Sequence, residues 1–301
     1  MSILADEQIG LSDGRRLGYA EFGAPDGLPL FYFHGFPGSR LEAALAGASA
    51  EALRIRIIAV DRPGYGRSDF KPGRLIRDWP DDVAELADAL SLDRFAVGGA
   101  SGGGPYVAAC AAKIPQRLTA AGILCGLGPL DAPGAMDGMA PLNRNALRLA
   151  RRSRWFVRAV MAVGGRFARR HPQTLLARIM ATSPEPDRIV LQRTALRRIL
   201  IETFVEAFRS GSRGPAWEVV LYGRPWGFDL TGIPIQVWLW QGEADTIVPP
   251  AMARYLAGVI PDCRATYYAN EAHFSLIVNR MQDMLGRLVE SPTASRSRQD
   301  A

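Results

Sequence analysis

Residues 94–110, RFAVGGASGGGPYVAAC, place five glycines around a single serine, Ser101, between an apolar run and an alanine-rich run. An apolar run that ends at glycine is typical of a buried strand, and the alanine-rich run after it indicates a helix. Glycine in such a turn costs conformational entropy, so the geometry must require it. The spacing Gly99-Ala100-Ser101-Gly102-Gly103 has the form G-x-S-x-G, which predicts a serine held exposed on a sharp strand-to-helix turn.

The same order of strand, turn and helix recurs along most of the chain. Three strands are expected in residues 9–35, with a hairpin signal at Asp13-Gly14, and helical spacing follows in 39–54. Helical patterns separate the further strand-like runs, at residues 54–61, 94–100, 118–126, 233–242 and 264–270. Alternating strands and helices with short glycine-containing connections predict an α/β fold with a mainly parallel sheet covered by helices on both faces.

The alternation breaks between Pro129 and Asp229, where the chain is helix-like and rich in arginine. A helical segment inserted late in an α/β domain, with the sheet resuming after it, is most simply a cap over the carboxyl edge of the sheet. We therefore expect a core in residues 1–128 and 230–290 and a helical cap in 129–229. Residues 291–301 are small and polar, which predicts a disordered tail.

Composition limits the classes of protein to consider. The 301 residues are 48% hydrophobic and 22% charged, which is ordinary for a soluble globular protein. No apolar run approaches the roughly 18 residues of a membrane span, and the first ten residues lack the pattern of a signal peptide, so a cytoplasmic location is expected. The three cysteines lack the spacing of metal ligands, which predicts reduced core thiols.

The net charge of +6 comes from arginine, and much of the excess falls between Arg144 and Arg224. Apolar residues at helical spacing accompany these arginines, which indicates amphipathic helices with a solvated basic face. An anionic substrate or a membrane surface remains an alternative explanation. No nucleic-acid-binding motif accompanies the charge, so nucleic acid is not expected as a partner.

A serine hydroxyl is a poor nucleophile until a base takes its proton, and histidine is the usual base near neutral pH. The chain contains only His34, His171 and His273. His273 lies between the last strand signal and the last helix, which places it on the same sheet edge as Ser101. His171 precedes Pro172 within the expected cap, which indicates a surface or packing residue. His273 is therefore the predicted base.

The base needs a carboxylate that fixes its tautomer and stabilises the imidazolium. Asp245 follows a strand of strong β character and falls between Ser101 and His273 in sequence. We predict Asp245 as the acid, with Glu243 and Asp131 as alternatives.

A second donor for a developing oxyanion is expected from the loop after an earlier strand. The stretch HGFPGSR, residues 34–40, suits it, because Gly35 frees the backbone and the N–H of Phe36 can point at the charge. The other donor is the N–H of Gly102, at the start of the helix that follows Ser101. His34 is expected to anchor the loop rather than act as a second base.

The motifs HGFPGSR, DRPGYGRSD, GGASGGGP, GEADTIVP and EAHFS, in this order and spacing, resemble the α/β-hydrolase fold superfamily over nearly all of residues 9–290. The resemblance implies a catalytic Ser101, Asp245 and His273, with oxyanion donors at Phe36 and Gly102. The layout is also similar to the capped branch that includes epoxide hydrolases and haloalkane dehalogenases. Those enzymes use an aspartate nucleophile, whereas Ser101 favours acyl transfer to water.

These observations together predict a serine hydrolase that cleaves a small or medium carboxylic ester or related acyl compound through an acyl-enzyme. The acyl-enzyme mechanism needs no metal and no organic cofactor. The alternatives are a C–C bond hydrolase, lyase or perhydrolase with the same triad, or a hydrolase-like ligand receptor with little turnover. The expected partner is a partly apolar small molecule, and a homodimer is an open possibility. Four residues are candidates for the substrate pocket or its loop: His34, Gly35, Trp155 and Trp226.

Overall fold

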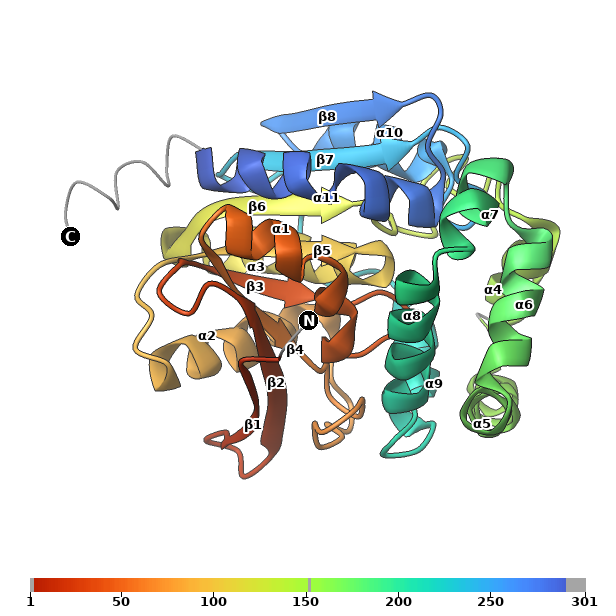
Figure 1. Ribbon diagram of the computed structural model, residues 1–301, viewed down its shortest axis with the longest axis horizontal. Coiled ribbons are helices and arrows are strands. Elements are labelled where there is room, and N and C mark those ends of the chain that lie inside the picture. The colour runs from red at the N-terminus through yellow and green to blue at the C-terminus, as the bar shows by residue number, and fades with distance from the viewer. Residues whose placement is uncertain (1–2, 151–152, 291–301) are drawn as a thin grey trace.

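A single sheet forms the centre of the molecule in the computed structural model, which describes residues 3–150 and 153–290 (Figure 1). The eight strands lie in the order β1-β2-β4-β3-β5-β6-β7-β8. The pairs β1–β2 and β2–β4 are antiparallel, and the remaining five pairs are parallel. The predictions of an α/β fold and a mainly parallel sheet are confirmed.

Most strands lie in or close to the predicted runs, but β1 begins four residues before the predicted start at Ile9, and β7 begins four residues after the predicted start at Ile233. The strands are β1 (Ala5–Gly10), β2 (Arg16–Gly23), β3 (Leu28–Phe33), β4 (Ile55–Val60), β5 (Phe95–Ala100), β6 (Leu118–Leu124), β7 (Val237–Gly242) and β8 (Cys263–Tyr268). The helices packed on the sheet are α1 (Gly47–Ala52), α2 (Trp79–Ala89), α3 (Gly104–Lys113), α10 (Pro250–Val259) and α11 (His273–Glu290).

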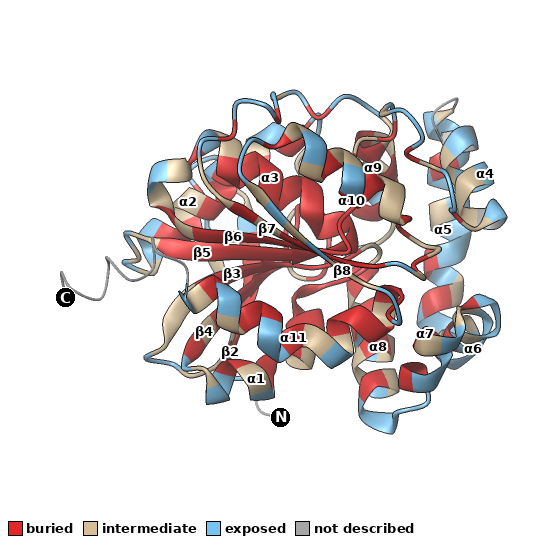
Figure 2. Cartoon of the chain, turned by 90° about the horizontal axis from the view of Figure 1, so that it is seen from above, coloured by how far each residue is buried: buried red, intermediate tan, exposed pale blue. Residues whose placement is uncertain are grey.

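Helices cover both faces of the sheet (Figure 2). The cluster under α2, α3 and α10 includes Phe31 and Val97, and the cluster under α1 and α11 includes their chain neighbours Leu30 and Ala96. Successive strand side chains point to opposite faces, so a strand buried on both sides is apolar throughout. This is why β3 and β5 show no alternation of apolar and polar residues.

Residues 39–54 do not form one helix. They form a 3₁₀ turn, η1 (Arg40–Leu45), and then the short α1. Arg40 is buried and donates from Nη1 to Asp61 at 2.8 Å and to Glu206 at 2.7 Å. These contacts hold the first turn against two other segments, which tightens it and separates it from α1.

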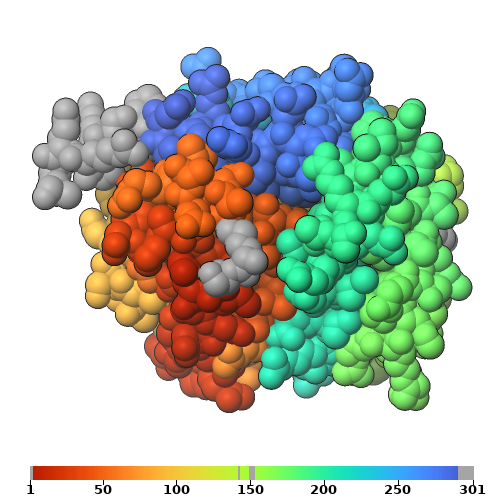
Figure 3. Space-filling model, viewed as in Figure 1, coloured from red at the N-terminus to blue at the C-terminus, as the bar shows by residue number. Residues whose placement is uncertain are grey.

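Six helices lie between β6 and β7, beyond the carboxyl ends of the parallel strands (Figure 1), and form one end of the molecule (Figure 3). They are α4 (Pro141–Ala150), α5 (Arg154–Arg170), α6 (Pro172–Thr182), α7 (Glu185–Leu191), α8 (Thr194–Ala207) and α9 (Arg213–Tyr222). The predicted segment 129–229 contains all six, and its division from the core stays a prediction. The predicted tail, 291–301, lies outside the described residues.

Two of the glycines around Ser101, Gly99 and Gly103, are required by close backbone contacts. A Cβ on Gly103 would lie 2.2 Å from the carbonyl oxygen of Phe33, and one on Gly99 would lie 2.9 Å from the carbonyl oxygen of Gly103. Both neighbours are backbone atoms, which cannot move aside as a flexible side chain can. The turn therefore brings β3, β5 and the start of α3 closer together than any residue with a Cβ allows.

The substitution Gly103→Ala should lower the free energy of unfolding by about 3 kcal/mol, because the new methyl group forces the turn away from β3. Gly98→Ala is the matched control, since its Cβ would lie 3.6 Å from the nearest heavy atom, a side-chain atom of Leu30, in ordinary van der Waals contact. Urea denaturation of both variants measures the difference. Equal losses in the two variants would contradict this account of the turn.

Candidate active site

Ser101 is the first residue after β5 and begins a 3₁₀ turn, η3 (Ser101–Gly103), that leads into α3. Its φ of 54° lies in the left-handed region that residues other than glycine seldom adopt. The N–H of Leu127 donates to the carbonyl oxygen of Ser101 at 2.9 Å, which fixes the turn against the segment after β6. Backbone strain of this kind concentrates at functional sites.

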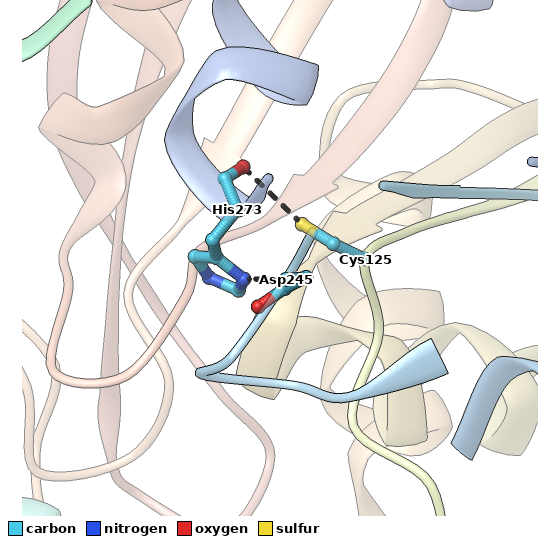
Figure 4. Close-up of side chains that lie close together, drawn as sticks. All are labelled: Cys125, Asp245 and His273. Carbon is cyan, nitrogen blue, oxygen red and sulfur yellow. Dashed lines mark hydrogen bonds and ion pairs between the residues drawn. The ribbon is translucent and has the colours of Figure 1, made fainter. Parts of the chain in front are cut away.

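His273 and Asp245 meet at the same carboxyl edge (Figure 4). His273 begins α11, Asp245 lies in the loop after β7, and His273 Nδ1 is 2.7 Å from Asp245 Oδ2. The other carboxylate oxygen of Asp245 accepts hydrogen bonds from the N–H groups of Ile247 and Val248, at 2.8 and 2.9 Å. The carboxylate is therefore fixed in position, and it orients the imidazole through Nδ1.

The ionisation of His273 is set by two opposing effects. Burial alone lowers the pKa of the imidazolium, but the adjacent Asp245 carboxylate outweighs it and holds the pKa of His273 well above 6.5. The neutral imidazole, which can accept a proton, is therefore favoured at alkaline pH.

Asp187, on α7, holds the start of α11. Its carboxylate accepts hydrogen bonds from the N–H groups of His273 at 3.2 Å and Ser275 at 2.8 Å. Free N–H groups at a helix N-terminus favour a negative partner. A carboxylate of the inserted helices thus pairs with the N-terminal N–H groups of α11, the helix that carries the candidate base. The sequence analysis missed this contact.

Cys125 lies beside the histidine (Figure 4). One atom each from Cys125, Asp245 and His273 lie within 4.8 Å of one another, which is close enough to consider a metal ion. However, His273 Nδ1 and Asp245 are already bonded to each other, and burial raises the pKa of the Cys125 thiol. The Cys125 Sγ lies 3.8 Å from the backbone carbonyl of His273, so the group is better suited to positioning the histidine than to binding a metal.

The loop after β3 carries the predicted oxyanion donor. Within the described residues, the N–H of Phe36 donates to no acceptor, and Phe36 and Gly102 both border the same cavity. The hydroxyl of Tyr222, on α9, lies 2.9 Å from the carbonyl oxygen of Gly102 and would lie 2.3 Å from a Cβ at that position. Gly102 therefore admits a close contact between the serine turn and α9.

Glu42 is a buried carboxyl directly behind this loop, and the sequence analysis missed it. It accepts hydrogen bonds from the Tyr32 hydroxyl at 2.8 Å and from the N–H of Gly35 at 3.0 Å. A Cβ on Gly35 would lie 3.3 Å from Glu42 and 3.4 Å from the Cβ of Ser101, so Glu42 approaches the candidate nucleophile closely. Burial raises the pKa of Glu42 above its ordinary value.

Glu42→Gln should lower kcat of the hydrolysis proposed below by about tenfold while leaving KM nearly unchanged, because it weakens the hold on the N–H of Gly35 and removes a carboxylate near His273. Kinetics across pH check it, since losing a nearby negative charge should move the acid limb of kcat/KM to lower pH. Glu51→Gln, at an exposed position on α1, is the control. An unchanged limb with an unchanged kcat would show that Glu42 is structural only.

His34 and the loop after β4 form a buried polar network with α9. His34 Nδ1 lies 2.8 Å from the carbonyl of Gly35, and burial together with Arg62 holds the pKa of His34 well below 6.5, so the ring is neutral. Arg62 donates to the carbonyl oxygen of Gly35 at 3.1 Å and to Glu218 on α9 at 2.8 Å. Burial raises the pKa of Glu218, but Arg62 and Arg74 outweigh it and bring the pKa below its ordinary value. The network ties the loop after β3 to α9, so His34 has the geometry of a residue that anchors this loop.

A cavity of about 310 Å³ lies between Ser101 and the inserted helices. Among the residues that the structure describes, no charged side chain lines it, and Ser101, Asn143 and Tyr222 supply its polar side chains. The apolar lining comes from the loops after β3, β6 and β7 and from α4, α5 and α9: Phe36, Pro37, Leu127, Ala146, Leu147, Phe156, Val157, Val160, Met161, Val219, Ile247 and Val248.

The four tentative pocket residues do not border this cavity. His34 is buried behind the loop, and Gly35 lies against Glu42. Trp155 is 65% exposed on α5, whereas its neighbour Phe156 lines the cavity, because successive helix positions differ by about 100°. Trp226 is buried in the core cluster beneath α2 and α3.

The remaining candidates are separate from the site. His171 is exposed at the end of α5 and packs against Phe167, with 5.4 Å between ring centroids. Glu243 is bonded to Arg254 at 2.9 Å, and Asp131 is exposed. Of the three acids considered from the sequence, Asp245 is the one bonded to a histidine.

The chain belongs to the alpha/beta hydrolase fold family, whose model matches residues 29–280. Curated relatives include a non-heme chloroperoxidase from Streptomyces lividans, 33% identical over 121 residues, or 40% of this chain and 44% of that protein. A proline iminopeptidase from Neisseria meningitidis is 30% identical over 119 residues, or 36% of each chain. The matches thus span less than half the length of these relatives.

Among solved structures, the esterase RhEst1 from Rhodococcus sp. ECU1013 superposes with a TM-score of 0.67 and 21% identity, covering 97% of this chain and 100% of that one. The enol-lactonase from Burkholderia xenovorans LB400 has a TM-score of 0.66 and 18% identity, covering 94% and 99%. At this identity the likeness shows the fold. The predicted family is confirmed, and the comparisons support an enzyme of the hydrolase class.

Proposed function

We propose that this chain is a serine esterase in which Ser101, His273 and Asp245 form the catalytic triad. The observation that carries the proposal is the 2.7 Å contact between His273 and Asp245 at the sheet edge where Ser101 occupies its left-handed turn. The cavity bordered by Ser101 supports it, because a substrate carbonyl can reach the serine there.

In the proposed reaction, neutral His273 takes the hydroxyl proton of Ser101 as its oxygen attacks the ester carbonyl. The N–H groups of Phe36 and Gly102 stabilise the tetrahedral oxyanion. His273 then gives the proton to the departing alcohol, which leaves an acyl group on Ser101. Water, deprotonated by His273, attacks this acyl-enzyme, and His273 returns the proton to the oxygen of Ser101 as the carboxylic acid leaves.

The cavity suits an uncharged, largely apolar acyl or alcohol group of small to medium size. The described part of its lining holds no charged side chain, so a substrate carboxylate placed against it would lose its hydration without gaining a partner. Neutral esters should therefore be hydrolysed faster than analogues that carry a carboxylate.

The likeness to a non-heme chloroperoxidase favours testing peroxide as a second acceptor for the acyl group. Perhydrolysis would use the same acyl-enzyme and differ in the nucleophile of the second step.

Intact-protein mass spectrometry after treatment with a fluorophosphonate tests the proposal. One adduct on the wild type, absent from Ser101→Ala and slow to form on His273→Ala, is the expected result. Panels of neutral esters, with and without hydrogen peroxide, and of β-diketones would then separate esterase, perhydrolase and C–C hydrolase chemistry. A folded wild type that forms no adduct would overturn the triad assignment and favour a ligand receptor.

A further inference from the structure

The basic charge of this protein is concentrated in one segment. Residues 138–184 contain ten arginines and no aspartate, glutamate or lysine. The rest of the chain holds 26 Lys and Arg against 30 Asp and Glu, a net charge of −4. The segment builds α4, α5 and α6, at the end of the molecule away from the sheet (Figure 2).

The described arginines of this segment are not neutralised by carboxylates of the described residues. Eight of them lie in the described residues, and none of the eight forms an ion pair there, whereas buried arginines of the core such as Arg40 and Arg62 each bind carboxylates. Arg154 and Arg158 instead lie over the ring of Trp155, at 5.7 and 5.2 Å from its centroid. The segment therefore presents uncompensated positive charge to its surroundings.

The same helix exposes apolar side chains. Seven large apolar residues are exposed in the described part of the chain, and four of them, Trp155, Phe156, Val160 and Val163, lie on α5. Trp155 is 65% exposed and Val163 is 72% exposed. The inner side of α5 is occupied, because Val157 packs against Ala216 and Val219 of α9. α5 thus has an inner face that holds the fold and an outer face that is both apolar and basic.

The outer face adjoins the entrance of the cavity. Phe156 and Val160 are each 42% exposed, and both also line the cavity that contains Ser101. A surface that covered the outer face of α5 would therefore lie next to the opening through which an apolar substrate enters.

We propose that the outer face of α5, defined by Trp155, Arg158, Val163, Arg166 and Arg170, docks on an anionic lipid bilayer. The arginines contact lipid phosphates, and the apolar side chains enter the headgroup boundary. The docked enzyme then takes neutral esters dissolved in the bilayer into the cavity, a step that rests on the esterase function proposed above.

A bilayer fits these observations better than a soluble acidic partner. Tryptophan and aliphatic side chains flanked by arginine suit an interface that is apolar on one side and charged on the other, whereas an acidic protein or a nucleic acid would match the charge alone. No helix among the described residues is long and apolar enough to span a membrane. Docking on the surface is therefore the mode that the described helices allow.

Sedimentation of the full-length Ser101→Ala protein with vesicles tests the docking without any hydrolysis. We expect strong binding to phosphatidylcholine vesicles that contain phosphatidylglycerol, weak binding to phosphatidylcholine alone, and release at high salt. Changing Arg158, Arg166 and Arg170 together to glutamine should weaken binding on the order of 100-fold, at a few-fold for each charge near the surface. Changing Trp155 and Val163 to serine should weaken it by roughly tenfold.

The charge-matched control changes three exposed arginines of the core, Arg54, Arg264 and Arg287, to glutamine and should bind as the parent does. In a wild-type background, the α5 variants should keep their activity on a water-soluble ester and lose it on a vesicle-bound one. Loss of binding by the control as large as that of the α5 variants, or retention on heparin without binding to vesicles, would overturn the proposal. If Ser101→Ala binds and the wild type hydrolyses no ester, the docking stands and the esterase function fails.

Discussion

Replacement of Ser101 by alanine should lower kcat/KM for a neutral ester by about 10⁴-fold or more, because no acyl-enzyme can then form. The activity that remains would come from the oxyanion donors and from substrate binding, which the substitution leaves in place. Initial rates on a p-nitrophenyl ester measure the loss, with thermal unfolding as the check on the fold. Ser101 lies in a turn fixed by backbone contacts, so the variant should unfold at nearly the wild-type temperature.

Ser39→Ala is the matched control for this experiment. Ser39 is buried near the oxyanion loop, and its hydroxyl lies 2.8 Å from that of Thr203 on α8. Its loss should lower the free energy of unfolding by about 1 kcal/mol and leave kcat/KM within a few-fold of wild type. A Ser101→Ala variant that keeps kcat/KM close to wild type, or one no less active than Ser39→Ala, would rule out Ser101 as the nucleophile.

Local sequence signals predicted the parts of this site that depend on neighbouring residues. The turn at residues 94–110 is fixed by close backbone contacts that exclude a Cβ at Gly99, Gly103 and Gly104, which accounts for three of its five glycines. Parallel strands place their carboxyl ends on one edge, so the sequence pattern alone predicts that Phe36, Ser101, Asp245 and His273, each of which follows a strand, lie at that edge.

The residues that the sequence analysis missed act across long separations in the chain. Glu218 contacts Arg62 across 156 positions, and Asp187 contacts His273 across 86. No periodicity signals such pairs, because each carboxylate lies on an inserted helix whose orientation is set by packing. Glu42 is closer in sequence to its partner, since it lies seven residues after Gly35. It stands among apolar residues at helical spacing, where a carboxylate that becomes buried needs a hydrogen-bond donor.

The residues that line the cavity also could not be predicted from sequence spacing. Trp155 and Phe156 are adjacent in sequence, yet Phe156 lines the cavity and Trp155 does not. Hydrophobic spacing identifies an amphipathic helix. When apolar side chains lie on both faces, however, the spacing does not determine which of two neighbouring residues faces the interior. On α5 both faces are partly apolar, so only contacts with α9 decide which side faces the cavity.

Asp245→Asn should lower kcat/KM by about 10⁴-fold at neutral pH, since an amide can neither stabilise the imidazolium nor hold the tautomer that leaves Nε2 free to accept a proton. Asparagine keeps an oxygen for the N–H groups of Ile247 and Val248, so the loop itself should remain in place. Glu243→Gln and Asp131→Asn are the matched controls, and each should stay within a few-fold of wild type because neither carboxylate contacts a histidine. Equal effects of Asp245→Asn and Glu243→Gln would contradict the assignment of the acid.

The pH dependence gives a second and independent readout. His273 acts as a base only when neutral, and Asp245 raises its pKa, so kcat/KM of the wild type should rise with pH through a limb that lies above 6.5. Asp245→Asn removes the charge that favours the protonated ring, while burial still disfavours it. The pH at which kcat/KM of Asp245→Asn rises should therefore be lower than in the wild type. Loss of a nearby positive charge would shift it to higher pH. A limb that stays in place would mean that another group sets the ionisation of the base.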